Sequence, residues 1–426
     1  MSDAITVLGA GAVGVSSAIH LQRRGWRVTL VDRGEPGGGT THGNAGVINP
    51  GSIVPLNSPD LHRVLAGLLG NRHAALRYDR RHVLAELPWA LAYLRASKTR
   101  AATETARALA TLTRDVLEEH RALMQRTGNL HRLTEVGWLK AYRRSRDPGH
   151  TSFEERLLAE CGIATVRHDA ASLAELEPAL KPIFVAATEL PGGGLVDRPG
   201  ELFAEHAARF VADGGTLERR EVTGVEATET GLRLCTDGPG LACGRLVIAA
   251  GPWSGELLAS VGYEVPLGVE RGYHAHYEPT GEHRLGRSVH DVDASYVVGP
   301  MGGALRVTTG VELAPRDAPS NLAQLEQVEP RVREAIDIGE RTPERVWRGA
   351  RPTLPDSRPA IGAVPGRDDL WVNFGHQHIG MMSGPVSGKL LAQLVSGETP
   401  DIDMKPFSPG RWVRRAPRRR RRRRER

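Results

Sequence analysis

Three glycines near the N-terminus have the spacing of a dinucleotide-binding turn. Gly9, Gly11 and Gly14 stand in GAGAVG, directly after an apolar run, and a second apolar run ends at Asp32. The first glycine permits a tight bend, the second lets the backbone approach a pyrophosphate, and the third lets a helix pack closely on a strand. The free N–H groups of that helix would face the phosphates, and Asp32 would accept hydrogen bonds from a ribose diol. The pattern predicts strand, glycine turn, helix and strand.

Two histidines near the C-terminus are candidates for contact with a substrate. His376 and His378 flank Gln377 in FGHQHIGMM, and alternation along a short extended segment would place both side chains on one side. Such a pair could also bind a metal ion, but the sequence suggests no third ligand. We therefore expect no metal site.

The elements that must position these residues mix helix and strand patterns. Turn-forming residues are dense over 34–51, which predicts a loop lying over the bound nucleotide. Helical spacing of apolar residues predicts one long amphipathic helix over 101–126. Short strands and turns alternate over 263–347, which predicts a β-rich domain that interrupts the nucleotide-binding domain. The fold class is therefore α/β with a second, α+β domain that contains a β-sheet.

Charge and cysteine content restrict the partners and the compartment. The formal net charge is +6, but the eleven arginines and one glutamate from Arg411 onward contribute +10, which leaves −4 for the rest. The high isoelectric point thus reports the C-terminal segment and not a basic binding face. Cys161, Cys235 and Cys243 form no CxxC pair, which favours a reducing compartment. Because no run of eighteen apolar residues occurs, we expect a cytoplasmic protein without a spanning helix.

The Arg-rich segment 410–426 is predicted to be a disordered tail. Arg418 to Arg424 are seven consecutive arginines, and such a run cannot collapse on itself. It could be a nucleic-acid arm, a patch that contacts anionic lipid at the inner face of a membrane, or an extension without a role. We favour the last of these, and we do not expect nucleic acid to be a partner.

Several separated blocks of the sequence resemble one family, the FAD-dependent amine and D-amino-acid oxidoreductases of the D-amino-acid oxidase superfamily. The likeness is closest to the D-amino-acid dehydrogenases and spans nearly the whole chain up to about Pro409. The blocks that carry it, besides GAGAVG, are GNAGVINPG, VIAAGPWS, WRGARPTLPDSRPAIG and FGHQHIGMMSGPVSGKLL. The resemblance implies a Rossmann-type FAD-binding domain assembled from 1–60, 192–258 and 347–409, and a substrate domain formed by 61–191 and 259–346.

The resemblance also implies which residues bind the cofactor. The start of the C-terminal helix would face the pyrimidine edge of the flavin, where reduction loads negative charge that a helix N-terminus stabilises. The relatives that attach FAD covalently use a cysteine or a histidine; residues 349–354 contain no cysteine, and His42 is offset by one position. FAD is therefore expected to bind without a covalent bond. The cofactor-binding residues implied are Gly9, Gly11, Gly14, Asp32, Arg33, Thr41, Asn44, Ala45, Gly46, Val222, Gly251, Gly380, Met381 and Met382.

For the substrate, the resemblance points first to Arg351. This residue resembles the carboxylate-binding arginine of the family, whose planar fork suits a bidentate pair; the alternative is an arginine that forms a structural salt bridge. His378 stands where glycine oxidase-like relatives have a second arginine. Tyr273 and His274 lie where a substrate-domain strand of the family faces the flavin, although alternation in ERGYHAHYE is also typical of any half-buried strand.

The reaction implied is oxidative deamination of a D-amino acid, with a D-proline derivative as one candidate. A hydride would pass from Cα to flavin N5, and the imine would give a 2-oxo acid, while the electrons pass to an acceptor other than oxygen, such as a quinone or a carrier. One alternative is an oxidase for glycine or sarcosine that uses O2. Another, of a different class, is a nucleic-acid-associated flavoprotein that uses the Arg-rich segment. A purely NAD-dependent dehydrogenase would leave the middle and C-terminal blocks without a purpose.

Overall fold

The glycine motif forms the unit that its spacing predicts. The computed structural model describes residues 4–59, 70–71, 73–145, 151–229, 231–342 and 346–416. In it β1 (Ala4–Leu8), α1 (Ala12–Gln22) and β2 (Arg27–Asp32) follow one another, and β1 and β2 pair in parallel. Both strands are largely buried, as expected of a parallel sheet covered on both faces.

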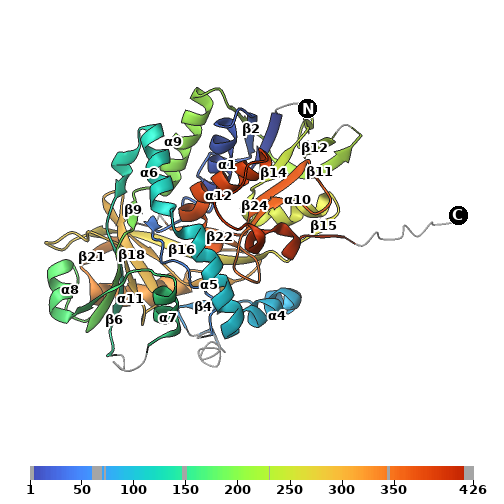
Figure 1. The fold of residues 1–426 in the computed structure, drawn as a ribbon. Coiled ribbons are helices and arrows are strands. Elements are labelled where there is room, and N and C mark those ends of the chain that lie inside the picture. Colours follow the sequence, from blue (N-terminus) through green and yellow to red (C-terminus); the bar gives the residue numbers. More distant parts are fainter. Residues whose placement is uncertain are drawn as a thin grey trace.

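This unit belongs to a six-stranded sheet, and the sheet is parallel except for its last strand. Its strands come from three separate stretches of the chain. Figure 1 shows β2, β14 and β24, one strand from each stretch, in the part of the molecule that also holds α1, α10 (Ser254–Ser260) and α12 (Gly380–Val395). In order the strands are β10 (Thr216–Arg219), β2, β1, β14 (Leu246–Ile248), β24 (Leu370–Phe374) and β23 (Ala360–Ala363).

The other large sheet has eleven strands, and it holds residues expected in both domains. β16 (Gly268–Pro279) is its longest strand and pairs with β22 (Trp347–Thr353), which the sequence analysis places in the FAD-binding segment. The remaining strands are β4 (Leu76–Tyr78), β20 (Val311–Leu313), β19 (Ala304–Thr308), β18 (Tyr296–Met301), β17 (Val289–Asp291), β6 (Trp138–Tyr142), β8 (Ala186–Leu190), β7 (Val166–Asp169) and β21 (Ile338–Arg341).

Smaller sheets and helices complete the described part. Three short sheets join β11 (Val222–Thr228), β12 (Gly231–Thr236) and β13 (Leu241–Cys243); β3 (Val47–Ile48), β9 (Gly194–Val196) and β5 (Leu133–Thr134); and β15 (Tyr263–Glu264) with β25 (Arg414–Arg415). Besides α5 and α6, described below, the helices not yet named are α3 (Arg80–Ala85), α4 (Leu87–Ala96), α7 (Phe153–Glu160), α8 (Ala170–Leu176), α9 (Pro199–Ala212) and α11 (Ala323–Ala335). No helix among the residues described is long and apolar enough to cross a bilayer.

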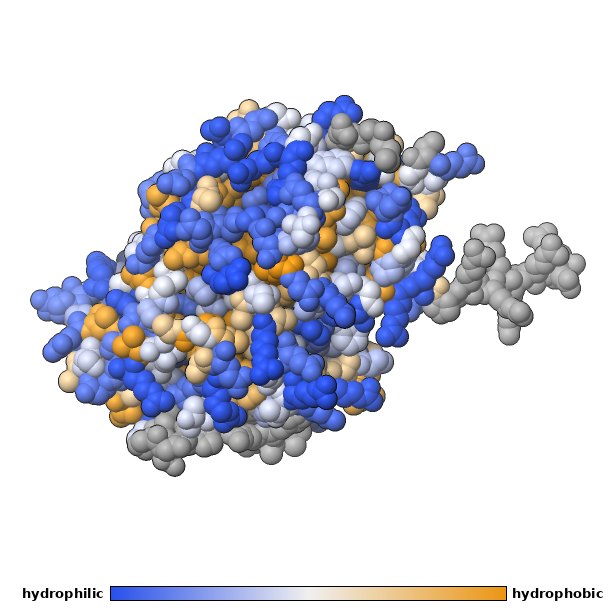
Figure 2. Space-filling model, viewed as in Figure 1, coloured by the Kyte–Doolittle hydropathy of each residue, from blue (hydrophilic) through white to orange (hydrophobic). Residues whose placement is uncertain are grey.

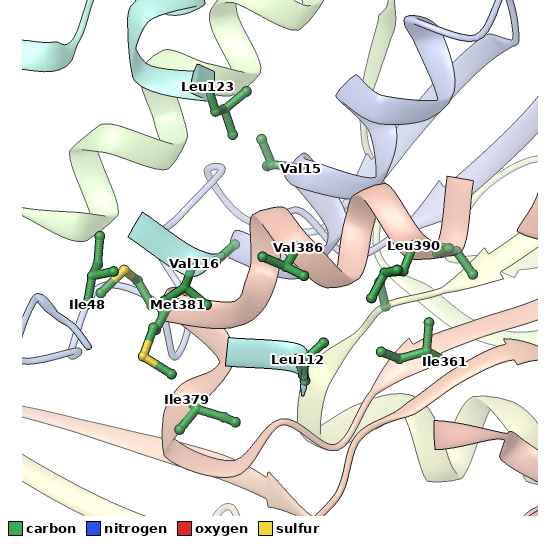
Figure 3. Close-up of a cluster of buried hydrophobic side chains, with 14 of the residues drawn as sticks. Val15, Ile48, Leu112, Val116, Leu123, Ile361, Ile379, Met381, Val386 and Leu390 are labelled. Atoms are coloured by element: carbon green, nitrogen blue, oxygen red, sulfur yellow. The ribbon is translucent and has the colours of Figure 1, made fainter. Parts of the chain in front are cut away.

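The helix predicted over 101–126 is two helices, and both pack against a third helix near the C-terminus. The chain turns between α5 (Thr99–Thr113) and α6 (Val116–Thr127), and both contact α12 (Gly380–Val395) of the nucleotide-binding domain. Figure 3 shows Leu112 and Val116 gathered with Met381 and Val386 in that core. The reason is that α12 is buried along nearly its whole length, so it needs apolar partners on several sides.

Two glycines of α12 allow it to lie directly against α1. A Cβ at Gly384 would stand 3.1 Å from the Ala12 carbonyl carbon, and one at Gly388 would stand 2.7 Å from that of Ser16. Close helix contact of this kind fixes the first turn of α12 beside the first turn of α1. The surface shown in Figure 2 is mostly polar, with apolar side chains in smaller patches.

The boundary predicted for the Arg-rich tail is wrong by seven residues, because 410–416 are ordered. Arg411 binds Asp356, with 2.9 Å between Nε and Oδ2, and Val413 is 2% exposed. Burial opposes ionisation of Asp356, yet Arg411 and Arg358 hold the pKa of its carboxyl below the ordinary value. β25 then pairs with β15. The net charge of the segment does not indicate these contacts, because individual residues make them. Residues 417–426 lie outside the described residues.

Truncation separates the anchored part from the remainder. We expect a chain that ends at Ala416 to melt at the same temperature as the full chain. A chain that ends at Pro409 should melt at least about 5 °C lower, because Asp356 loses a buried partner and the core loses the buried side chain of Val413. Thermal unfolding followed by circular dichroism measures both. Equal melting temperatures for the two truncations would show that 410–416 stabilise nothing.

Candidate active site

One cavity of about 1100 Å³ brings most of the predicted site residues together. It runs along the carboxyl ends of β1 and β2, past the loop 38–47 and the start of α12, to the strands β16 and β22. Its volume exceeds the range of a drug-sized ligand, so it can hold a dinucleotide and a small substrate. The predicted residues that line it are Gly9, Gly11, Asp32, Arg33, Thr41, Asn44, Ala45, Val222, Gly251, Tyr273, Arg351, His378, Gly380, Met381 and Met382. Gly14, Gly46 and His274 are not among the lining residues.

The three motif glycines have different physical roles. A Cβ on Gly9 would stand 2.4 Å from the Ala249 carbonyl oxygen, and one on Gly14 would stand 1.7 Å from that of Gly9. These two glycines are therefore required by the fold itself. A Cβ on Gly11 would meet only Thr41 Oγ1, at 3.4 Å. The fold therefore leaves room for a side chain at Gly11, and this residue lines the cavity. A glycine here fits a backbone that a pyrophosphate must approach closely.

Side chains organise the nucleotide end of the cavity around the start of α1. Thr41 Oγ1 accepts a hydrogen bond of 2.9 Å from the Ala12 N–H, so the glycine-rich loop is tied to this helix. Asp32 accepts from the Ala10 N–H at 2.6 Å and from the Gly34 N–H at 2.8 Å, at the carboxyl end of β2. These contacts hold the carboxylate at the position where a ribose diol is expected.

Arg33 and Trp253 mark the far side of the nucleotide end. The Arg33 guanidinium lies 4.1 Å from the Trp253 ring centroid, and Arg316 approaches the same ring at 4.9 Å. Val222 lines this end as well. Arg316 comes from the loop after β20, so residues that precede and follow the large β16 strand both contribute to the cavity.

The loop 42–46 is held by Arg306 and Asn44. Arg306 Nη1 donates to the His42 and Asn44 carbonyl oxygens at 2.9 and 2.6 Å, and burial lowers the pKa of Arg306 to about 10. Asn44 Nδ2 donates to the His378 carbonyl oxygen at 3.3 Å. Gly46 adopts φ 79°, and a Cβ there would stand 2.3 Å from the Val196 carbonyl oxygen. Gly46 was expected to bind the cofactor, but it does not line the cavity and instead shapes the loop from outside it.

The two histidines do not lie on an extended segment, so the predicted alternation is wrong. β24 ends at Phe374, and Gln377–Ile379 form a 3₁₀ turn that leads directly into α12. Gln377 has φ 49°, a conformation that non-glycine residues rarely adopt and that clusters at functional sites. As predicted, Gly380, Met381 and Met382 begin the helix whose first N–H groups lie at the cavity.

Both histidines are neutral near physiological pH. Burial lowers the pKa of His376 to about 3, and burial together with Arg351 lowers the pKa of His378 to about 4. A neutral imidazole cannot act as a second cation for a carboxylate. Three buried polar atoms of this turn have no hydrogen-bond partner in the described residues: His376 Nε2, Gln377 Nε2 and His378 Nδ1. Buried polar atoms are usually hydrogen-bonded, so these three could bind a ligand in the cavity.

The strands β16 and β22 form the floor of the other end. Gly272 and Gly349 are directly paired, and two long side chains lie over them from opposite directions. A Cβ on Gly272 would stand 2.4 Å from Arg351 Nη2, and one on Gly349 would stand 1.9 Å from the ring of Trp347. The two glycines therefore create the space in which Arg351 and Trp347 rest, and both side chains line the cavity.

Tyr273 and His274 occupy opposite faces of β16. Tyr273 belongs to the core under the sheet, where its hydroxyl donates to Glu312 Oε2 at 2.5 Å and accepts from Arg271 at 2.7 Å. His274 stacks on Trp347 with 5.2 Å between ring centroids, and burial lowers its pKa to about 2. Tyr273 thus has no free hydroxyl for a substrate, and His274 supports Trp347 from behind the cavity wall.

Sequence reasoning missed several residues that line the Arg351 end. Lys140 and Trp138 come from β6, with Lys140 Nζ 4.9 Å from the Trp138 ring centroid, and Lys140 pairs with Glu154 of α7. His290 of β17 stacks on Trp138 at 6.1 Å. Of these residues, Trp347 alone could have been predicted from the sequence, because it stands beside the GARP stretch. Lys140, Trp138 and His290 reach the site through the pairing of β6 with β17, which no local sequence pattern indicates. In the described residues no group of three metal-binding side chains occurs.

Comparison with known proteins agrees with this architecture. The family model described as FAD dependent oxidoreductase matches residues 4–394. A D-amino-acid oxidase of Bradyrhizobium diazoefficiens is 33% identical over 426 residues, covering 96% of this chain and 99% of that protein. A D-amino acid dehydrogenase of Methylobacterium nodulans is 30% identical, covering 97% and 100%.

Solved structures show the same fold. The glycine oxidase of Geobacillus kaustophilus is 24% identical, with a TM-score of 0.68 and coverage of 95% of this chain and 97% of that one. The L-proline dehydrogenase of P. horikoshii is 19% identical, with a TM-score of 0.72 and coverage of 96% and 97%. Together with the glycine cradle, the cavity and the full-length family match, these likenesses establish that the chain belongs to the FAD-dependent oxidoreductase family and uses FAD.

Proposed function

We propose that this enzyme oxidises a D-amino acid, with Arg351 binding the α-carboxylate. The observation that carries the proposal is the Arg351 guanidinium, which lies over Gly272 in the wall of the cavity. Relatives named D-amino-acid oxidase and D-amino acid dehydrogenase, at 33% and 30% identity, support the substrate class. FAD bound in this cavity would accept the hydride from the substrate Cα.

The residues of the chain would bind and orient the amino acid. Arg351 offers a planar fork to the carboxylate. Among the described residues its guanidinium makes a single, long hydrogen bond, 3.5 Å to the Gly310 carbonyl oxygen. Trp347 would cover one side of the substrate, and the turn 376–378 would face it from the start of α12. Because His378 is neutral, the carboxylate would depend on Arg351 alone for a strong bidentate contact.

The side chain of the amino acid would point toward Lys140, Trp138 and His290. Lys140 is 8% exposed and already paired with Glu154, so this end presents a nearly balanced ion pair beside two aromatic rings. Such a lining accepts a cyclic or an aliphatic side chain through ring contact. This supports a D-proline derivative as one candidate and leaves glycine or sarcosine with unfilled space.

We further propose that FAD is held without a covalent bond. His42, the histidine of the glycine-rich loop, does not line the cavity, and neither do Cys161, Cys235 and Cys243. The free cysteines also fit the proposed reducing, cytoplasmic location. We propose a quinone or a carrier as the electron acceptor in place of O2, because relatives of the chain are named dehydrogenases. Residues 417–426, which could contact a membrane or nucleic acid, lie outside the described residues.

A panel of amino acids tests the proposed function. Under anaerobic conditions we expect D-amino acids, D-proline among them, to bleach the flavin at 450 nm at least about 100-fold faster than their L-enantiomers, because only one hand places the Cα–H toward the flavin while the carboxylate stays on Arg351. In air, reduction of an artificial dye should exceed peroxide formation. Faster bleaching by glycine or sarcosine, with stoichiometric peroxide, would favour the oxidase alternative and overturn the proposal.

A further inference from the structure

A buried carboxylate lies next to Arg351, and the proposed function does not use it. Glu270 is directly opposite Arg351 in the pairing of β16 with β22, so both side chains are on the same face of the sheet. Glu270 is 2% exposed. Its Oε1 accepts a hydrogen bond of 3.2 Å from the Tyr93 hydroxyl of α4, and its Oε2 has no partner among the described residues.

The positive charge of Arg351 acts on this carboxylate, but the guanidinium is directed elsewhere. No ion pair joins the two side chains in the part of the chain that the structure describes, because the guanidinium extends over Gly272 toward the cavity. Burial nevertheless raises the pKa of Glu270, while Arg351 and the hydroxyls of Tyr93 and Thr353 lower it. Arg351 is thus the cation that favours the ionised form of Glu270.

Few other charged or titratable groups act on Glu270. Tyr93 approaches from α4, and burial raises its pKa well above the ordinary value, so it remains a neutral donor. Thr353, on β22, offers only a hydroxyl. His378 senses Arg351 and Lys140, but its own pKa is lowered to about 4, so it stays neutral. The charge state of Glu270 therefore depends mainly on whether Arg351 is engaged by another anion.

We propose that Glu270 is a positioning residue for Arg351 and takes up one proton when a carboxylate binds there. Two carboxylates that share one buried cation cannot both stay ionised cheaply, so the pKa of one rises. The substrate carboxylate is held by two charge-assisted hydrogen bonds, whereas Glu270 Oε2 is unpartnered, so Oε2 receives the proton from solvent. The inference rests on the proposed role of Arg351, but not on which amine is oxidised.

The sign of the pH dependence follows directly. Binding that consumes a proton is favoured at low pH, so the affinity for a carboxylate should fall as pH rises above the pKa of Glu270 in the free enzyme, approaching tenfold per pH unit. Below that pKa, Glu270 is already protonated and the affinity should be constant. When Glu270 is replaced by glutamine, the site is permanently in its binding state and the dependence should vanish.

Acetate is a suitable probe, because it has a carboxylate and no amino group that titrates nearby. With the FAD-loaded enzyme between pH 6 and 9, we expect its Kd, measured from the flavin absorbance change, to rise above the pKa of Glu270 with a slope approaching tenfold per unit. Calorimetry in two buffers of different ionisation enthalpy should give an uptake near one proton. Glu270→Gln should give a flat profile and bind acetate at least about tenfold tighter at pH 8. Glu312→Gln, which alters a buried glutamate on the opposite face of β16, should keep the wild-type slope.

A flat wild-type profile with no proton uptake would overturn the inference, whether or not the variant folds. So would weaker acetate binding by Glu270→Gln with an unchanged slope, since that is the signature of a purely structural role. If no D-amino acid reduces the flavin but acetate binding shows the predicted proton uptake, the proposed function fails while the pairing of Glu270 with Arg351 stands.

Discussion

Replacement of Arg351 by methionine will lower kcat/KM for a D-amino acid about 10²- to 10⁴-fold. The estimate follows from two charge-assisted hydrogen bonds of about 1.5–3 kcal/mol each, with about 1.4 kcal/mol for each factor of ten. Arg351→Lys should recover only part of the loss, because an ammonium keeps the charge but not the planar fork that a carboxylate matches. Steady-state kinetics with an artificial electron acceptor measures the three enzymes.

The methionine variant leaves Glu270 buried without its cation, so loss of activity could reflect loss of stability. The double variant Arg351→Met with Glu270→Gln removes both charges and is the matched control. We expect it to melt close to wild type and to remain as inactive as the single variant. Recovery of activity in the double variant would show that Arg351 acts on the fold and not on the substrate.

The second large effect concerns the glycine cradle, in which two neighbouring substitutions should fail for different reasons. In Gly11→Ala the new methyl meets only Thr41 Oγ1, at 3.4 Å, so the protein should fold normally but lose at least about 100-fold in affinity for FAD. In Gly14→Ala the methyl would stand 1.7 Å from the Gly9 carbonyl oxygen, so the turn itself must open and the protein should unfold at a lower temperature.

Flavin content after purification, together with the melting temperature of the apoprotein, distinguishes the two effects. Gly238→Ala is the control, because no atom lies within 4 Å of a Cβ at that turn. It should retain both FAD and stability. A fully yellow Gly11→Ala protein would mean that no phosphate approaches this backbone, and the assignment of the nucleotide end would have to be withdrawn.

The nucleotide end was predictable because its determinants are local. Asp32 binds the Ala10 N–H across only 22 positions, and the turn, helix and second strand follow one another without interruption. The spacing of the glycines in the motif already predicts the steric role of each one. The start of α12 was also predictable, from a resemblance carried by contiguous residues.

The other end was less predictable because it is assembled by strand register. Glu270 and Arg351 meet only because β16 and β22 pair antiparallel in one particular alignment, and a shift of one residue would turn one of them to the other face. The same argument explains Tyr273, which alternation alone cannot assign to the cavity side or the core side. Lys140 reaches the site through the pairing of β6 with β17, far away in the sequence.

Two errors came from reading composition or periodicity without packing. Residues 101–126 have one continuous helical pattern, yet the chain turns at Arg114 and Asp115 so that both halves can contact α12. The basic residues after Pro409 mask Trp412 and Val413, which pack against the nucleotide-binding domain. The conformation of His376 and His378 was missed because Gln377 has φ 49° and begins a 3₁₀ turn, which the alternation of residue types does not indicate.

The central claim is that Arg351 grips the carboxylate of an amino acid beside bound FAD. Anaerobic stopped-flow reduction with D-alanine and with D-alaninamide, which replaces the carboxylate by a neutral amide, tests it without altering the protein. The account predicts that the flavin is bleached by D-alanine at least about 100-fold faster at limiting concentration. Equal rates for the two compounds would contradict it.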